Sequence, residues 1–188
     1  MNDQAHDQVP GLNAATDPAT DLTTDPALAA LAHKICSRAQ ILARVAELPR
    51  PLVFTNGVFD ILHRGHVTYL AQARALGASL IVALNSDASA KRLGKGADRP
   101  VNTLADRAAV IAALGCVERV TWFEADTPLE LILAVKPDVL VKGGDWKPEA
   151  IVGAREVQGW GGRVHSIAFA HQRSTTSLLE RVRASEPR

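Results

Sequence analysis

Five short apolar runs recur along the chain, and the segments between them have helical features; this order constrains the fold more than any other feature. The runs that predict strands are residues 52–55, 80–84, 119–123, 138–142 and 163–167. The segments that predict helices are residues 65–76, 103–114, 127–135, 149–158 and 174–184. Because alternating strands and helices form parallel sheets, we expect an α/β fold: a Rossmann-like, doubly wound, parallel five-stranded sheet with helices on both faces.

The composition divides the chain into three parts. Residues 1–26 are rich in Asp, Thr, Ala and Pro, and too few of them are apolar to offset the entropy of ordering, so a disordered tail is expected. Residues 27–49 predict an N-terminal helix, because apolar residues recur at helical spacing until Pro49. The main domain is expected over residues 50–186, which hold all the predicted strands.

Length, charge and cysteine content exclude several classes of protein. The 188 residues suffice for one domain and a tail. A formal net charge of +1 provides no general attraction to nucleic acid or to an anionic membrane. No apolar run approaches the ~20 residues of a membrane span, and the N-terminus lacks the features of a secretion signal. Cys36 and Cys116 lie far apart in the sequence and lack the spacing of a metal site. This pattern indicates two reduced thiols in a cytoplasmic protein. We therefore expect a cytoplasmic protein with no nucleic-acid or membrane partner.

The residues after the first predicted strand favour phosphate binding. Thr55 to His66 read TNGVFDILHRGH, so His63 and His66 flank Gly65 at the start of a predicted helix. A helix N-terminus presents unpaired N–H groups and a partial positive charge to an anion. The imidazoles add donors that can stabilise charge on a reacting phosphate, and glycine allows a close approach to the backbone. From the residues alone, phosphate binding, half of a metal site and a structural role all stay open; no further His or Cys stands nearby, so no metal ligand is assigned.

Other polar clusters also follow predicted strands, where open parallel sheets bind their ligands. These are Asn85 after the second strand, Lys142, Gly143, Gly144 and Asp145 after the fourth, and Arg173, Ser174, Thr175 and Thr176 after the fifth. A basic loop after the second strand adds Lys91, Arg92, Lys95 and Arg99, and a later helix adds Arg107. Each cluster has a structural alternative, namely a turn, a helix N-cap or a solvated surface. Their convergence on one edge of the sheet favours a nucleotide site.

Several of these motifs together resemble a known enzyme superfamily. The segments TNGVFDILHRGHVTYLAQARALG, IVALNSDASAKRL, RPVN and LVKGGDWKPE, with a late STT at a helix start, resemble the HxGH nucleotidyltransferases, in particular the heptose 1-phosphate adenylyltransferase branch. The resemblance spans about residues 28–183 and implies a nucleotidyltransferase domain over residues 50–186. It implies transfer of AMP from ATP to D-glycero-β-D-manno-heptose 1-phosphate, giving ADP-heptose and pyrophosphate, for lipopolysaccharide inner-core synthesis. The attacking phosphate is already ionised, so the reaction depends on positioning and charge stabilisation.

The resemblance also implies a role for each candidate residue. His63 and His66 would be catalytic and would contact the reacting phosphates. The residues implied to bind ATP are Thr55, Asn56, Gly57, Phe59, Gly65, Gly143, Gly144, Asp145, Arg173, Ser174, Thr175 and Thr176. The residues implied to contact the substrate phosphate are Asp60, Asn85, Lys91, Arg92, Lys95, Arg107 and Lys142. Mg²⁺ would bridge ATP oxygens through water and substrate, and no protein ligand is assigned to it.

Two departures from relatives affect the choice of substrate and partners. Related glycerol-3-phosphate cytidylyltransferases have an arginine where this chain has Phe169, which favours the adenylyltransferase but leaves a cytidylyltransferase for a small alcohol phosphate as the alternative. A nucleotide-binding regulatory module without chemistry is a third possibility. Some relatives carry a fused sugar kinase, for which the N-terminal stretch is too short, so a separate heptose kinase and a phosphatase are expected in the pathway. Because relatives often form dimers, a homodimer is expected.

Overall fold

The computed structural model describes residues 28–94, 96 and 99–168. The predicted tail over 1–26, the predicted helix over 174–184 and Phe169 lie outside these residues. So do five candidate site residues, namely Lys95, Arg173, Ser174, Thr175 and Thr176.

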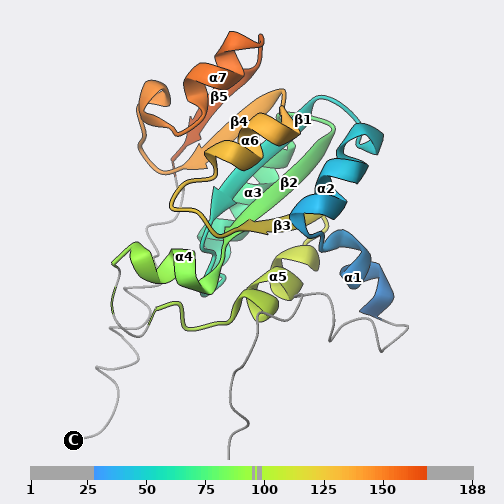
Figure 1. Ribbon diagram of the computed structural model, residues 1–188, viewed down its shortest axis with the longest axis vertical. Coiled ribbons are helices and arrows are strands. Elements are labelled where there is room, and N and C mark those ends of the chain that lie inside the picture. The colour runs from blue at the N-terminus through green and yellow to red at the C-terminus, as the bar shows by residue number, and fades with distance from the viewer. Residues whose placement is uncertain (1–27, 95, 97–98, 169–188) are drawn as a thin grey trace, which may run out of the picture.

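Five parallel strands form a single sheet (Figure 1). They are β1 (Leu52–Gly57), β2 (Ser79–Asn85), β3 (Arg119–Phe123), β4 (Val139–Gly143) and β5 (Arg163–Ile167), and their order is β3-β2-β1-β4-β5. The central strand β1 pairs with β2 on one side and β4 on the other, so that Val53 lies between Leu80 and Val139. The predicted fold class, a doubly wound parallel five-stranded sheet, is confirmed, and all five predicted strands exist within two residues of their predicted ends.

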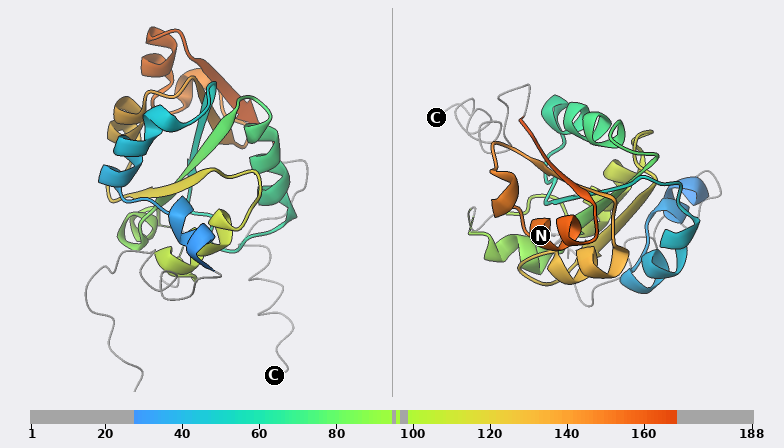
Figure 2. Two further views of the ribbon diagram at one scale, coloured as in Figure 1. Left: turned by 90° about the vertical axis from the view of Figure 1, so that its right-hand side faces the viewer. Right: turned by 90° about the horizontal axis from the view of Figure 1, so that it is seen from above.

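Helices cover both faces of the sheet, because successive side chains of each buried strand point to opposite sides (Figure 2). Helices α3 (Arg64–Arg74) and α5 (Leu104–Ala112) pack on the face that includes Val53 and Val82. Helices α2 (Arg38–Arg44), α6 (Leu129–Val135) and α7 (Ala154–Gly159) pack on the face that includes Phe54 and Ile81. Burying each such side chain contributes about 1.5–3 kcal/mol, so two apolar layers hold the ends of the strands in register.

The N-terminal segment differs from the single helix predicted over residues 27–49. It forms α1 (Ala29–Lys34), α2 and a 3₁₀ helix, η3 (Val45–Glu47). Between the first two helices, Ile35 forms a bridge with Val120, and the N–H of Cys36 donates to the Val120 carbonyl at 2.8 Å. Ser37 then restarts the helix with a capping box to Gln40. The helix is interrupted because this segment covers the outer edge of β3.

Two further segments also depart from prediction. The basic loop after β2 begins with a short helix, α4 (Asp87–Arg92), which the side chain of Ser86 caps by accepting from the N–H of Ser89. The helix predicted over residues 149–158 is a 3₁₀ turn, η4 (Pro148–Ala150), followed by α7. In the part of the chain that the structure describes, no helix is long and apolar enough to cross a membrane.

Candidate active site

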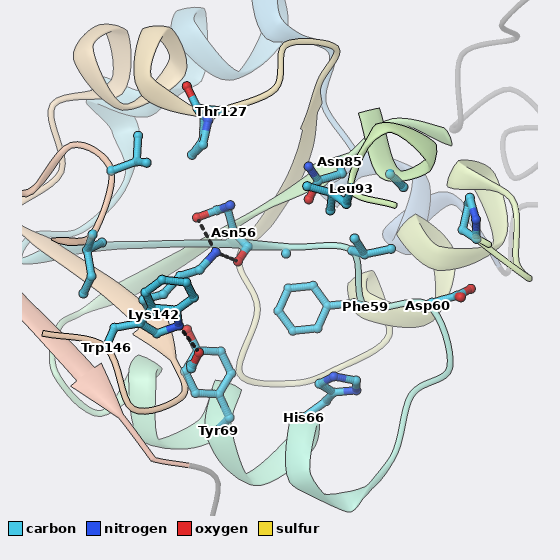
Figure 3. Close-up of a pocket in the computed structure, with 18 of the residues that line it drawn as sticks. Asn56, Phe59, Asp60, His66, Tyr69, Asn85, Leu93, Thr127, Lys142 and Trp146 are labelled. Atoms are coloured by element: carbon cyan, nitrogen blue, oxygen red, sulfur yellow. Dashed lines mark hydrogen bonds between the residues drawn. The ribbon is translucent and has the colours of Figure 1, made fainter. Parts of the chain in front are cut away.

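A pocket of about 620 Å³ opens at the carboxyl ends of β1, β2 and β4, the edge at which the sequence predicted the site (Figure 3). Its floor is the loop that follows β1. Open α/β sheets bind ligands beyond the carboxyl ends of their strands, at the point in the sheet where the order of the strands reverses. The lining residues are Asn56, Gly57, Val58, Phe59, Asp60, His63, His66, Tyr69, Asn85, Ala90, Leu93, Arg99, Pro100, Asp126, Thr127, Pro128, Lys142, Gly143, Trp146, Ala150, Ile151 and Val152.

The loop after β1 has a fixed shape. Phe59 has a positive φ of 49°, and its ring lies over Gly57 so closely that a Cβ there would be 2.8 Å from the ring. A larger residue in place of Gly57 would therefore displace the phenyl ring. Below the loop, the hydroxyls of Thr55 and Tyr69 form a buried hydrogen bond of 2.5 Å. Burial raises the pKa of Tyr69 far above its usual value, so its hydroxyl stays protonated. Thr55, which was predicted to bind ATP, thus lies beneath the pocket and supports Tyr69 in its wall.

The two histidines of the motif lie together at the start of α3. His63 is the N-cap residue of α3 and His66 is in its first turn. Their rings stack with centroids 3.9 Å apart and planes 21° apart. The rings of Phe59 and His66 form a T-shaped contact with centroids 5.2 Å apart. Gly65 is buried between them.

This environment sets the protonation state of His66. Burial, followed by the neighbouring charge of His63, lowers the pKa of His66 to about 4. His66 is therefore neutral at pH 7, and a neutral imidazole carries one N–H donor and one acceptor. His66 can therefore donate a hydrogen bond to a phosphate without first taking up a proton.

Residues after β4 form the opposite wall of the pocket. The ammonium group of Lys142 donates to the backbone carbonyl of Asn56 at 3.2 Å and to its side-chain oxygen at 3.3 Å. The indole N–H of Trp146 donates to the carbonyl of Gly143 at 3.1 Å. Gly144 has φ +112°, and a Cβ there would press on that indole at 3.1 Å. The glycine pair thus lets the chain turn so that Trp146 faces the pocket, whereas Asp145 is exposed and does not line it.

Several basic residues predicted to contact phosphate lie away from the pocket lining. Lys91 and Arg92 are exposed on α4. Arg92 forms an ion pair with Asp126 at 2.5 Å and donates to the carbonyl of Glu124. Arg107 has a fully buried side chain. None of these three is among the residues that line the pocket, and their predicted contact with the substrate phosphate stays a prediction.

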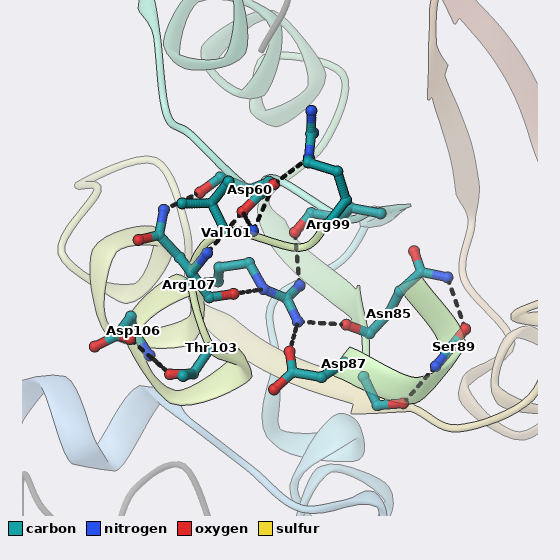
Figure 4. A network of polar contacts seen from close by, with 12 residues as sticks. Asp60, Asn85, Asp87, Ser89, Arg99, Val101, Thr103, Asp106 and Arg107 are labelled. Atoms are coloured by element: carbon teal, nitrogen blue, oxygen red, sulfur yellow. Dashed lines mark hydrogen bonds and ion pairs between the residues drawn. The ribbon is translucent and has the colours of Figure 1, made fainter. Parts of the chain in front are cut away.

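The guanidinium of Arg107 ties three chain segments together (Figure 4). It donates to the carbonyls of Val58 at 2.7 Å, Asn85 at 2.9 Å and Asn102 at 3.1 Å. It also pairs with the carboxylate of Asp87 at 2.7 Å. Backbone carbonyls turned inward need donors, and a planar fork with five N–H groups can satisfy several at once. Arg107 thereby fixes the loop after β1 against the end of β2.

Asp60 was predicted to contact the substrate phosphate, but it is an acceptor within the protein. Its carboxylate accepts from Arg99 at 2.6 Å and from the N–H groups of Val101 and Asn102 at 2.9 Å each. The side chain of Asn102 donates to the Asp60 carbonyl at 2.5 Å. A carboxylate repels a phosphate, so this network assigns Asp60 to holding the loop and Arg99.

Sequence reasoning did not assign several pocket residues. Trp146 directly follows the Gly-Gly-Asp segment, so extending that motif by one residue would have included it. Tyr69 lies six residues after His63, on the inner side of the same helix. The unassigned apolar part of the wall has no sequence signal, and it comprises Val58, Ala90, Leu93, Pro100, Pro128, Ala150, Ile151 and Val152.

Comparison with known families accounts for this arrangement. The model of the cytidylyltransferase-like family matches residues 54–185, which include the loop after β1, both histidines and the segment after β4. The chain belongs to the cytidylyltransferase-like family. In this chain, His63 and His66 of the HxGH motif both line the pocket.

Curated relatives of this cytidylyltransferase-like chain include an enzyme named for a heptose phosphate. It is the D-beta-D-heptose 1-phosphate adenylyltransferase of Bordetella bronchiseptica, 60% identical over 152 residues that cover 80% of this chain and 94% of the relative. The bifunctional protein HldE of Pelobacter propionicus is 50% identical over 162 residues. These residues cover 81% of this chain and 33% of that longer protein.

Solved structures agree on the fold. The lipopolysaccharide core biosynthesis protein from Thermoplasma volcanium is 31% identical, with a TM-score of 0.53 over 65% of this chain and 98% of its own. Pantothenate synthetase from Thermus thermophilus is 17% identical, with a TM-score of 0.51 over 72% of this chain and 61% of its own, and it shares the fold.

Proposed function

We propose that this protein transfers AMP from ATP to D-glycero-β-D-manno-heptose 1-phosphate, giving ADP-heptose and pyrophosphate, for synthesis of the lipopolysaccharide inner core. The observation that carries the proposal is the 60% identity to an enzyme named for this sugar phosphate, over nearly that enzyme's whole length. The pocket supports it, because it combines cations and neutral donors in a volume of about 620 Å³, within the range of small-molecule sites.

The proposed reaction is a single displacement. A phosphate oxygen of the sugar 1-phosphate attacks the α-phosphorus of ATP, a new P–O bond forms, and the bond to the β-phosphate oxygen breaks to release pyrophosphate. The attacking oxygen is already anionic, so no side chain needs to remove a proton. The N–H donors of His63 and His66 stabilise charge on the α-phosphate in the transition state. The role of the pocket is to align the two phosphates and hold that charge.

The two sides of the pocket are proposed to bind different parts of ATP. Gly143 and Trp146 offer a backbone edge and an aromatic face after β4, which suit a ribose and a base. Asn56, held by Lys142, lies between that wall and the histidines, which suits the α-phosphate. Ser174, Thr175, Thr176 and Arg173 are proposed to bind the β- and γ-phosphates.

Magnesium is proposed to accompany ATP. Within the described residues no group of three His, Cys, Asp or Glu side chains could hold a metal ion, and Asp60 is occupied by Arg99 and backbone N–H groups. Mg²⁺ keeps several waters and binds through substrate phosphates, so the proposed ion would be held mainly by ATP. When bound, it would neutralise part of the triphosphate charge. Because ATP is the co-substrate, we propose that the protein acts in the cytoplasm. We also propose that it is a homodimer and that a heptose kinase and a phosphatase supply its sugar phosphate.

Pyrophosphate release tests the proposal. The purified protein should release pyrophosphate from ATP only when heptose 1-phosphate is added. Turnover with CTP and glycerol 3-phosphate instead would support the alternative, a cytidylyltransferase for a small alcohol phosphate. Tight ATP binding without any phosphodiester product would indicate a regulatory module.

A further inference from the structure

The loop after β1 and the segment before α5 meet at a nearly buried ion pair in the pocket wall. Asp60 and Arg99 pair at 2.6 Å, and their side chains are 1% and 11% exposed. Asp60 also accepts from the backbone N–H groups of Val101 and Asn102 (Figure 4). These bonds fix the carboxylate on two sides, and the carboxylate in turn fixes the guanidinium.

The ion pair leaves the outer end of the guanidinium available to a ligand. Arginine has five N–H donors, and Asp60 uses the one on Nε. Within residues 28–94, 96 and 99–168, the Nη1 and Nη2 atoms of Arg99 form no hydrogen bond to the protein. Arg99 lines the pocket together with His63 and His66. In this part of the chain, no protein group competes with a ligand for the two outer nitrogens.

The charges in the pocket are divided between its two sides. Among the described lining residues, Lys142 and Arg99 are the cationic side chains. Lys142 lies on the β4 side and contacts Asn56, next to the wall proposed for the nucleoside. Arg99 lies across the pocket, bonded to the far end of the loop after β1. A second phosphate-bearing substrate entering beside ATP would meet Arg99.

We propose that Arg99 binds the phosphate of the sugar 1-phosphate and orients it for attack on the α-phosphorus, with Asp60 as the positioning residue; this rests on the proposed function. A guanidinium presents two parallel N–H groups that match two phosphate oxygens. The third phosphate oxygen then remains to attack. Anchoring through Nε means that the fork needs no reorganisation when the sugar phosphate arrives.

Steady-state kinetics of Arg99→Gln test this assignment. At saturating ATP, the KM for heptose 1-phosphate should rise about tenfold to a hundredfold, as expected for losing a charge-assisted pair of hydrogen bonds. The KM for ATP should change less than about threefold. Arg99→Lys keeps the positive charge but not the forked pair of donors. Its KM for heptose 1-phosphate should lie between the values of the native protein and of Arg99→Gln. Circular dichroism verifies that each variant is folded.

Arg50 provides a matched control. It pairs with Asp138 at 2.6 Å, and Asp138 also accepts from the backbone N–H of Leu52, so the arrangement resembles that of Arg99. This pair lies at the opposite end of the strands, and Arg50→Gln should leave both KM values unchanged. Asp60→Asn alone should raise the KM for the sugar phosphate. In protein that already carries Arg99→Gln, Asp60→Asn should raise this KM little further, because Asp60 acts through Arg99.

The outcomes separate this inference from the proposed function. An unchanged KM for heptose 1-phosphate in active Arg99→Gln protein, or an equal rise in both KM values, overturns the assignment. If the native protein shows no turnover with this sugar, the proposed function fails, and calorimetric titration with inorganic phosphate decides the role of Arg99. Binding at least tenfold weaker in Arg99→Gln supports a phosphate site, whereas equal binding, or none to the native protein, overturns it.

Discussion

Replacing Arg107 with methionine tests whether the buried guanidinium is structural. Methionine keeps an unbranched apolar stem but is shorter than arginine and removes every donor, so the carbonyls of Val58, Asn85 and Asn102 lose their partner. Asp87 also loses its cation, although its side chain is 39% exposed and water can solvate it. Breaking such a buried pair costs about 3–5 kcal/mol, a large part of the 5–15 kcal/mol that stabilises a typical domain.

Urea unfolding followed by circular dichroism measures this loss, with Arg38→Met as the control. Arg38 pairs with Glu130 on the surface, where the side chains are 57% and 75% exposed, so its loss should cost under about 1 kcal/mol. The structural account of Arg107 is refuted if Arg107→Met loses less than about 1 kcal/mol while the KM for the sugar phosphate rises. In that event Arg107 would be the phosphate ligand that the sequence first indicated.

Three further predictions concern the motif and its support. His66→Ala should lower kcat about 10²–10³-fold and change the ATP dissociation constant less than about threefold, because its contact strengthens in the transition state; equal losses in pyrophosphate release and in ATP titration would contradict this. Since the pKa of His66 is lowered from 6.5 to about 4, only the unfolded state gains a proton as pH falls from 6.5 to 4. Native protein should therefore lose more stability than His66→Gln between pH 7 and pH 5 in urea titrations, and above pH 7 the two proteins should show the same pH dependence. Tyr69→Phe should cost about 0.5–1.5 kcal/mol through the lost bond to Thr55, and an unchanged urea midpoint would count against that bond.

The fold could be predicted from the sequence because each strand is a short apolar run with local boundaries. Val53 and Phe54 are adjacent, yet each packs on a different helical layer, which is the pattern of a strand buried on both faces. The broken N-terminal helix could not be predicted, since Ile35 leaves the helix only to pair with Val120, 85 residues away in sequence. Local propensity gives no sign of such a distant partner.

The candidate site was predictable where a residue's role depends on its neighbours in sequence. His63 and His66 follow a strand and begin a helix, so their place at the pocket could be predicted from the motif alone. Arg99 and Arg107 are only eight residues apart in sequence, yet one lines the pocket and the other is buried. In the loop after β1, the Asp60 carboxylate accepts from Arg99 and the Val58 carbonyl accepts from Arg107. These two contacts, distant in sequence, decide which arginine faces the pocket.

Phosphorus NMR of the reaction mixture tests most directly whether this pocket joins AMP to a sugar phosphate. With ATP, Mg²⁺ and heptose 1-phosphate, the native protein should produce equal amounts of pyrophosphate and a sugar-linked diphosphate diester, and His66→Ala should produce neither at a comparable rate. Formation of ADP with a doubly phosphorylated sugar, or of pyrophosphate with free AMP and no diester, would contradict the account.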